Sequence, residues 1–88
     1  MVRYRVLVSG RVQGVCFRDT CRQLARQRGV RGWVRNLPDG RVEAVFEGPA
    51  GDVRHLVDWA RHGPRSAAVA DVSVQAEAPE GLGAFQIR

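Results

Sequence analysis

An α+β domain with the element order β-α-β-β-α-β is the fold that this 88-residue sequence predicts. Runs of β-branched and aromatic residues alternate with two segments whose apolar residues recur at three- and four-residue spacing, and glycine or proline separates most of them. A hydrophobic content of 44% with 26% charged residues is typical of a folded globular protein. No linker, repeat or low-complexity segment divides the chain, so we expect residues 1–88 to form a single domain.

The first half of the chain contains a strand, a helix and a second strand. Residues 3–9, R-Y-R-V-L-V-S, favour a strand that stops at Gly10. From residue 17 the spacing favours an amphipathic helix that ends at Gly29 and whose apolar positions are Phe17, Cys21, Leu24 and Ala25. Residues 30–36, V-R-G-W-V-R-N, form the second strand-like run.

The second half adds a hairpin partner, another helix and one or two strands. Residues 41–47, R-V-E-A-V-F-E, follow the second strand through L-P-D-G, and Asp-Gly at the end of such a connection is a strong hairpin signal. A second helix stops at Gly63, and its apolar face is formed by Val53, Leu56, Val57 and Ala60. Residues 69–77 alternate as a strand with Val72, Val74 and Ala76 on one side, and the last run, A-F-Q-I-R, can add an edge strand.

This order of elements is that of the ferredoxin-like sandwich. In that fold an antiparallel sheet, here of four to five strands, carries both helices on one face because the crossover connections are right-handed. The first and second strands run in the same direction with the third between them. We therefore expect the loop after Gly10 and the end of the second strand near Asn36 to lie at the same edge of the sheet.

The charged and sulfur-containing residues narrow the chemistry of the chain. The formal net charge is +5 and there is no lysine, which excludes Schiff-base lysine chemistry and the lysine of a P-loop. Arginine binds phosphate in bidentate fashion, although a compositional bias explains the arginines equally well. Cys16 and Cys21 fit neither a redox C-x-x-C pair nor a zinc site, and we interpret both as reduced thiols that fill space.

We expect neither a membrane span nor an N-terminal signal peptide in this sequence. No run approaches the roughly 18 apolar residues of a membrane span. The N-terminus, M-V-R-Y-R-V, lacks the continuous apolar stretch of a signal peptide. We therefore expect a cytoplasmic protein that has no membrane partner.

The loop S-G-R-V-Q-G-V-C-F-R, residues 9–18, is the first candidate site. N–H groups at a helix N-terminus lack partners within the helix, and several of them curled around one point bind an anion. Gly10 and Gly14 permit such a curl, and Arg18 in the first helical turn can point into it. The spacing differs from that of a Walker motif. On spacing alone, a strand-to-helix turn with a solvated arginine explains the loop at least as well.

Asn36, the only asparagine, is the second candidate. Its side chain can start a turn, which is the better explanation on local grounds. The topology instead suggests that it faces Arg18, where a carboxamide can hold a water molecule without ionising. Structural interpretations suffice for the other polar residues that stand out, namely Asp19, Asp39 and His55.

The blocks G-R-V-Q-G-V-C-F-R and G-W-V-R-N-L-P-D-G-R-V-E-A-V-F-E-G resemble the acylphosphatase family, and the resemblance covers about residues 3–88. It implies hydrolysis of the carboxyl–phosphate bond of small acyl phosphates, with no metal and no cofactor. It also implies that Asn36 positions the attacking water while loop amides and an arginine bind the phosphoryl group. The loop residues so assigned are Gln13, Gly14, Val15, Cys16, Phe17 and Arg18. We expect a monomer that binds no nucleic acid.

Two other functions remain open at this level. Basic ferredoxin-like domains bind RNA on the open face of the sheet, and the net charge favours that function. Against it, R-V-E-A-V-F-E does not match the RNP1 pattern of stacked aromatics and carries two acidic residues. The other alternative is a structural or carbamoyl-phosphate module of a larger enzyme, and the short chain argues against it.

Overall fold

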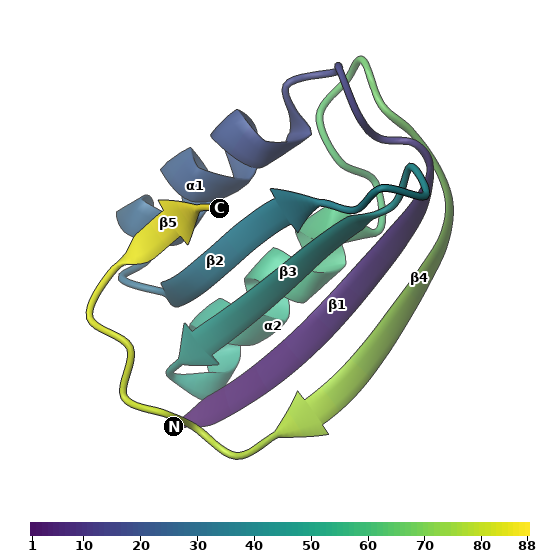
Figure 1. Cartoon of the computed structure of the whole chain (residues 1–88). Helices are drawn as coiled ribbons and strands as arrows, with labels where there is room; N and C mark the ends of the chain where they lie inside the picture. Colours follow the sequence, from purple (N-terminus) through teal and green to yellow (C-terminus); the bar gives the residue numbers. More distant parts are fainter.

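The computed structural model describes residues 1–88 and has the predicted order of elements (Figure 1). The strands are β1 (Val2–Arg11), β2 (Arg31–Asn36), β3 (Val42–Gly48), β4 (Ala68–Glu77) and β5 (Phe85–Ile87), and the helices are α1 (Phe17–Gln27) and α2 (Ala50–Ala60). Both helices pack on the same face of a single sheet (Figure 1). The predicted ferredoxin-like α+β fold is confirmed, and the sheet has five strands.

The strands lie in the order β4-β1-β3-β2-β5. β1 and β2 both pair antiparallel with β3, which lies between them as predicted. β5 pairs with β2 in parallel, with Val34 opposite Ile87. The expectation of an antiparallel sheet is therefore wrong at this edge, and the sheet is mixed.

The route of the chain after β4 explains the parallel pair. Residues 78–84 carry the chain from one edge of the sheet to the other, below the sheet in Figure 1. After this reversal β5 runs opposite to β4, which is the direction of β1 and β2, so it can join β2 only in parallel. The Glu47 carboxylate at the end of β3 holds the crossing segment by accepting hydrogen bonds from the N–H groups of Glu80 at 2.6 Å, Gly81 at 2.9 Å and Leu82 at 2.9 Å.

Apolar side chains fill the space between the sheet and the helices. Phe46 of β3 stacks on Phe85 of β5 with ring centroids 5.9 Å apart. The predicted helix faces are buried except at Leu24, which is half-buried, and alternate residues of β1 are buried as well. Val74 of β4 remains 37% exposed, because the helices pack mainly on the other four strands. The edge strand β4 therefore contributes little to the core.

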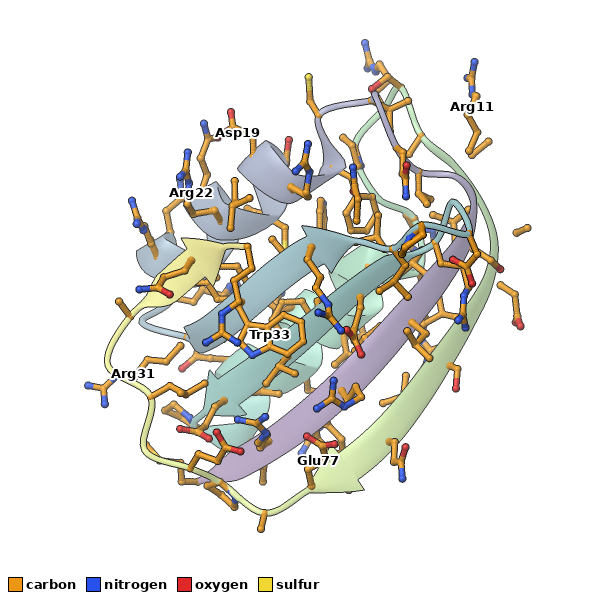
Figure 2. All side chains as sticks on the ribbon, in the orientation of Figure 1. Arg11, Asp19, Arg22, Arg31, Trp33 and Glu77 are labelled. Carbon is orange, nitrogen blue, oxygen red and sulfur yellow. The ribbon has the colours of Figure 1, made fainter.

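The other face of the sheet carries charged side chains, and Figure 2 shows Trp33 and Glu77 on it. Arg5 Nη1 and Arg35 Nε donate to the two oxygens of Glu43, each at 2.7 Å, and Arg5 Nε donates to Glu77 at 2.8 Å. Burial of Glu43 raises its pKa, but these hydrogen bonds outweigh it and hold the pKa below the ordinary 4.5. An Arg–Glu network thus covers β3, a central strand whose acids the sequence pattern did not mark as buried.

Candidate active site

The segment between β1 and α1 forms a curled loop at one end of the sheet. Gly14 and Cys16 have φ of 72° and 63°, and they flank Val15, whose φ is negative. Positive φ is uncommon for a residue other than glycine, and such strained positions cluster at functional sites. Residues that alternate between left-handed and right-handed backbone conformations turn successive N–H groups toward one point. The loop therefore has the backbone of an anion-binding site.

The N–H groups of this loop are available to a ligand. Those of residues 14–19 donate no hydrogen bond to any other backbone group, and the side chain of Cys16 does not cap the helix. They stand at the N-terminus of α1, where the helix dipole adds partial positive charge. A negatively charged group placed here gains both hydrogen bonds and a favourable field.

Hydrogen bonds from two side chains connect the loop to neighbouring segments. Gln13 Nε2 donates to the carbonyl oxygens of Leu37 at 2.8 Å and Arg41 at 3.0 Å, at the base of the β2–β3 hairpin. Ser66 Oγ, from the connection between α2 and β4, donates to the carbonyl oxygen of Val15 at 2.7 Å. Ser66 could not be identified from the sequence, because nothing in the local run P-R-S-A distinguishes it from any exposed loop serine.

Arg18 lies in the first turn of α1 and lines a pocket of about 200 Å³. It forms no ion pair with any carboxylate of the protein and donates no hydrogen bond within it. Arg22, one turn further along α1, is by contrast paired with Asp19 at 2.9 Å, and Figure 2 shows these two on the outer side of the helix. Asp19 also lines the pocket, but its charge is balanced by Arg22. Arg18 is therefore the free positive charge of the pocket.

Asn36, the last residue of β2, lines the same pocket as Arg18. Its Oδ1 is buried and accepts no hydrogen bond from the protein. A buried carbonyl oxygen without a donor typically costs about 1–3 kcal/mol, and such a group calls for an explanation. The turn that follows Asn36 does not use this oxygen, so the local explanation of the residue is insufficient.

Some, but not all, of the loop residues assigned to phosphate binding from the sequence line the pocket. The loop residues that line it are Gly14, Cys16, Phe17 and Arg18. The side chain of Gln13 instead reaches the hairpin, and Val15 packs against the core. Val12 and Ile87 line the pocket as well, and neither was predicted from the sequence. Ile87 reaches the pocket only because β5 lies parallel to β2, which no local pattern reveals.

A family model described as acylphosphatase matches residues 4–87. The chain belongs to the acylphosphatase family. Among its relatives, the acylphosphatase of Gloeobacter violaceus is 57% identical, and the match covers 98% of this chain and 92% of that protein. The acylphosphatase of Rubrobacter xylanophilus is 60% identical, with 98% and 79% covered. The crystal structure of acylphosphatase from Bacillus subtilis is similar with a TM-score of 0.95 and 40% identity, over 100% of this chain and 99% of that one.

Membership of the acylphosphatase family confirms the resemblance inferred from the two sequence blocks, and with it the prediction of an enzyme of that class.

Cys21 and His55, which were considered in the sequence, do not line the pocket. Burial raises the pKa of the Cys21 thiol far above its ordinary value, as expected for a core residue, and His55 is exposed on α2. No group of three or more His, Cys, Asp or Glu side chains is arranged so that it could hold a metal ion. Neither helix is long and apolar enough to cross a membrane.

Proposed function

We propose that this protein hydrolyses the carboxyl–phosphate bond of small acyl phosphates and releases a carboxylate and inorganic phosphate. One observation carries the proposal: a single pocket combines an arginine without a counter-ion, a loop of free N–H groups, and the unpartnered Oδ1 of Asn36. The activity named for the relatives from Gloeobacter violaceus and Rubrobacter xylanophilus supports it.

In the proposed mechanism, the loop and Arg18 bind the phosphoryl group. The guanidinium and the N–H groups of residues 13–18 contact the non-bridging phosphoryl oxygens. Charge on these oxygens develops in a largely dissociative transition state, so groups fixed around them before reaction provide most of the catalysis. Fixed donors of this kind stabilise that charge without a metal ion or a cofactor.

Asn36 positions the attacking water in this mechanism. Its Oδ1 accepts a hydrogen bond from the water and orients a lone pair toward phosphorus, opposite the leaving group. A bond forms between the water oxygen and phosphorus as the bond from phosphorus to the acyl oxygen breaks, and the electron pair leaves on the carboxylate. The water proton passes to phosphate or solvent. Because a carboxylate is a stable leaving group, no general acid is needed.

The first test is hydrolysis of benzoyl phosphate in the presence of EDTA. We expect wild-type turnover to persist with the chelator and to be inhibited by inorganic phosphate. Arg18→Gln should reduce kcat/KM by about 10²–10³ and abolish phosphate inhibition, because it removes a preorganised donor. Arg54→Gln is the matched control, since Arg54 is exposed on α2 and is not part of the pocket. Activity of Arg18→Gln at the level of this control would contradict the proposal.

Asn36→Ala separates water positioning from phosphate binding. We expect kcat to fall while the inhibition constant for inorganic phosphate stays near that of the wild type, because Arg18 and the loop remain. If the substitution weakens phosphate binding and leaves kcat unchanged, Asn36 does not have the role proposed here.

The RNA-binding alternative is disfavoured by the open face of the sheet. Trp33 is buried, and the guanidiniums of Arg5, Arg35 and Arg88 lie 5.5, 5.3 and 5.0 Å from its ring centroid. The ring is thus covered by arginines, two of which are paired with Glu43, and offers no platform on which a base can stack. Absence of RNA binding at physiological salt would remove this alternative.

We also propose that the enzyme acts as a monomer, since the proposed mechanism needs no residue beyond the loop, Arg18 and Asn36. Both cysteines are free thiols, as is usual in a reducing compartment, and this supports the proposal of a cytoplasmic location. The small pocket favours a small-molecule acyl phosphate as the substrate.

A further inference from the structure

We propose that Gln13 is a positioning residue that sets the place of Asn36 relative to the phosphate loop, and that its loss affects the catalytic step rather than phosphate binding. The proposal rests on the function proposed above. The resemblance assigned Gln13 to the phosphate-binding loop, whereas the structure directs its side chain elsewhere, toward the β2–β3 hairpin.

The carboxamide of Gln13 bridges both sides of the hairpin at its base. Nε2 donates to the carbonyl oxygen of Leu37, the residue directly after Asn36, at 2.8 Å, and to that of Arg41 at 3.0 Å. The N–H of Leu37 in turn donates to the same Arg41 oxygen at 2.8 Å. Since an amide nitrogen carries two hydrogens, both are used here and none remains for a ligand.

This bridge begins where regular strand pairing ends. The last pair of β1 with β3 is Val8 with Val42, and the last pair of β2 with β3 is Asn36 with Val42. Beyond this point β1 stays paired with β4 as far as Arg11 and then leads into the phosphate loop. The side chain of Gln13 therefore continues the connection between the loop and the hairpin past the end of the sheet. In-line attack is sensitive to such placement, and a displacement of about 1 Å can cost about 10² in rate.

Ser66 provides a contrasting contact on the other side of the loop. Its hydroxyl holds the carbonyl oxygen of Val15 at 2.7 Å. In a trans peptide the C=O and the following N–H point in opposite directions, so this bond also fixes the direction of the Cys16 N–H. Ser66 thus acts on the anion-binding amides and Gln13 on the hairpin that carries Asn36. Their substitutions should give different kinetic signatures.

The first experiment measures benzoyl phosphate hydrolysis by Gln13→Met, which is close in size to the native side chain but has no donor. We expect kcat to fall by roughly 10- to 100-fold while the inhibition constant for inorganic phosphate is unchanged. Ser66→Ala should instead weaken inhibition by phosphate. The matched control is Gln23→Met, because Gln23 is exposed on α1 and should behave as the wild type.

A double-mutant cycle with Asn36→Ala tests whether Gln13 acts through Asn36. In the Asn36→Ala background, Gln13→Met should have no further effect on kcat, since the water is no longer positioned. An equal loss of kcat in both backgrounds would overturn the proposal, as would a parallel loss of phosphate inhibition. Absence of turnover in the wild type, by contrast, would refute the proposed function itself.

Gln13→Glu gives a test that does not depend on the stability of the methionine variant. At neutral pH its carboxylate faces two carbonyl oxygens and cannot donate to either. Because acceptor oxygens disfavour the charged form, protonation above the ordinary glutamate pKa of about 4.3 restores one O–H donor. We expect kcat relative to the wild type to recover as the pH falls through this range. A constant ratio of the two kcat values across the range would contradict the positioning role.

Discussion

Glu47→Ala should strongly destabilise the fold, because Glu47 is a buried charge with four partners. Its side chain is 1% exposed, accepts hydrogen bonds from the N–H groups of residues 80–82, and lies 3.6 Å from Arg3 Nη1. Burial raises the pKa of Glu47, but these N–H groups and Arg3 together lower the pKa by more than burial raises it. The carboxylate is therefore charged at neutral pH. The substitution removes the anchor of the crossing segment.

The magnitude follows from what the substitution leaves behind. Removing one partner of a buried ion pair typically costs about 3–5 kcal/mol. Arg3, 4% exposed, keeps Glu77 at 3.0 Å and Glu80 at 3.5 Å, and the exposed N–H groups of the crossing segment can bind water, so we expect about 3 kcal/mol. At about 0.1 kcal/mol per residue, this is roughly a third of the stability of a domain of this size. The midpoint of thermal unfolding should fall by about 12 °C or more.

The assay is urea unfolding at pH 7, followed by tryptophan fluorescence. Glu80→Ala is the control, because Glu80 is 63% exposed and its pair with Arg3 should contribute less than about 1 kcal/mol. The Glu47→Ala variant should lose several times more stability than this control. A loss equal to that of Glu80→Ala would refute the reasoning that the buried carboxylate anchors residues 78–84.

Two further predictions concern pH and thiol reactivity. Hydrogen bonds from Arg5 and Arg3 lower the pKa of Glu77. The pKa values of Glu43 and Glu47 are also below the ordinary 4.5. The three carboxylates therefore stabilise the fold above about pH 4.5. This contribution should disappear as the pH falls through the lowered folded-state values, which urea midpoints between pH 7 and pH 3 would measure; midpoints independent of pH would contradict it. Cys16 is exposed and Cys21 buried with a raised pKa, so Ellman's reagent should react with one thiol in the native protein and with the second only after unfolding. Equal reaction rates for both would show that Cys21 is accessible.

Local sequence patterns predicted the strands, helices and turns that depend mainly on neighbouring residues. The strand-like run before Gly10 indicated β1, although the strand continues through Gly10 to Arg11. The spacing from Phe17 indicated α1, and Asp39 with Gly40 indicated the β2–β3 hairpin. The topology of these elements then brought Arg18 and Asn36 to one edge, and the structure has both lining one pocket. Two residues that lie 18 positions apart could be paired because the fold class constrains where strands end.

Contacts between distant segments could not be predicted in this way. The parallel pairing of β5 depends on the route of residues 78–84, which Glu47 of β3 holds through hydrogen bonds to backbone N–H groups. Alternation along β3 marks Glu43 as solvent-facing, whereas arginines of the neighbouring strands cover it. Ser66 lies 51 residues from Val15, and no local pattern indicates that pairing.

The direction of β5 has a practical consequence for handling the protein. Ile87 lines the pocket, and the N–H of Arg88 is tied to the carbonyl oxygen of Val34 at 2.9 Å. Figure 1 shows the C-terminus beside α1 and the N-terminus at the opposite end of the sheet. An affinity tag after Arg88 would therefore emerge at the pocket wall, whereas one before Met1 would emerge at the far end. Immobilisation through the N-terminus should leave every pocket facing the solution.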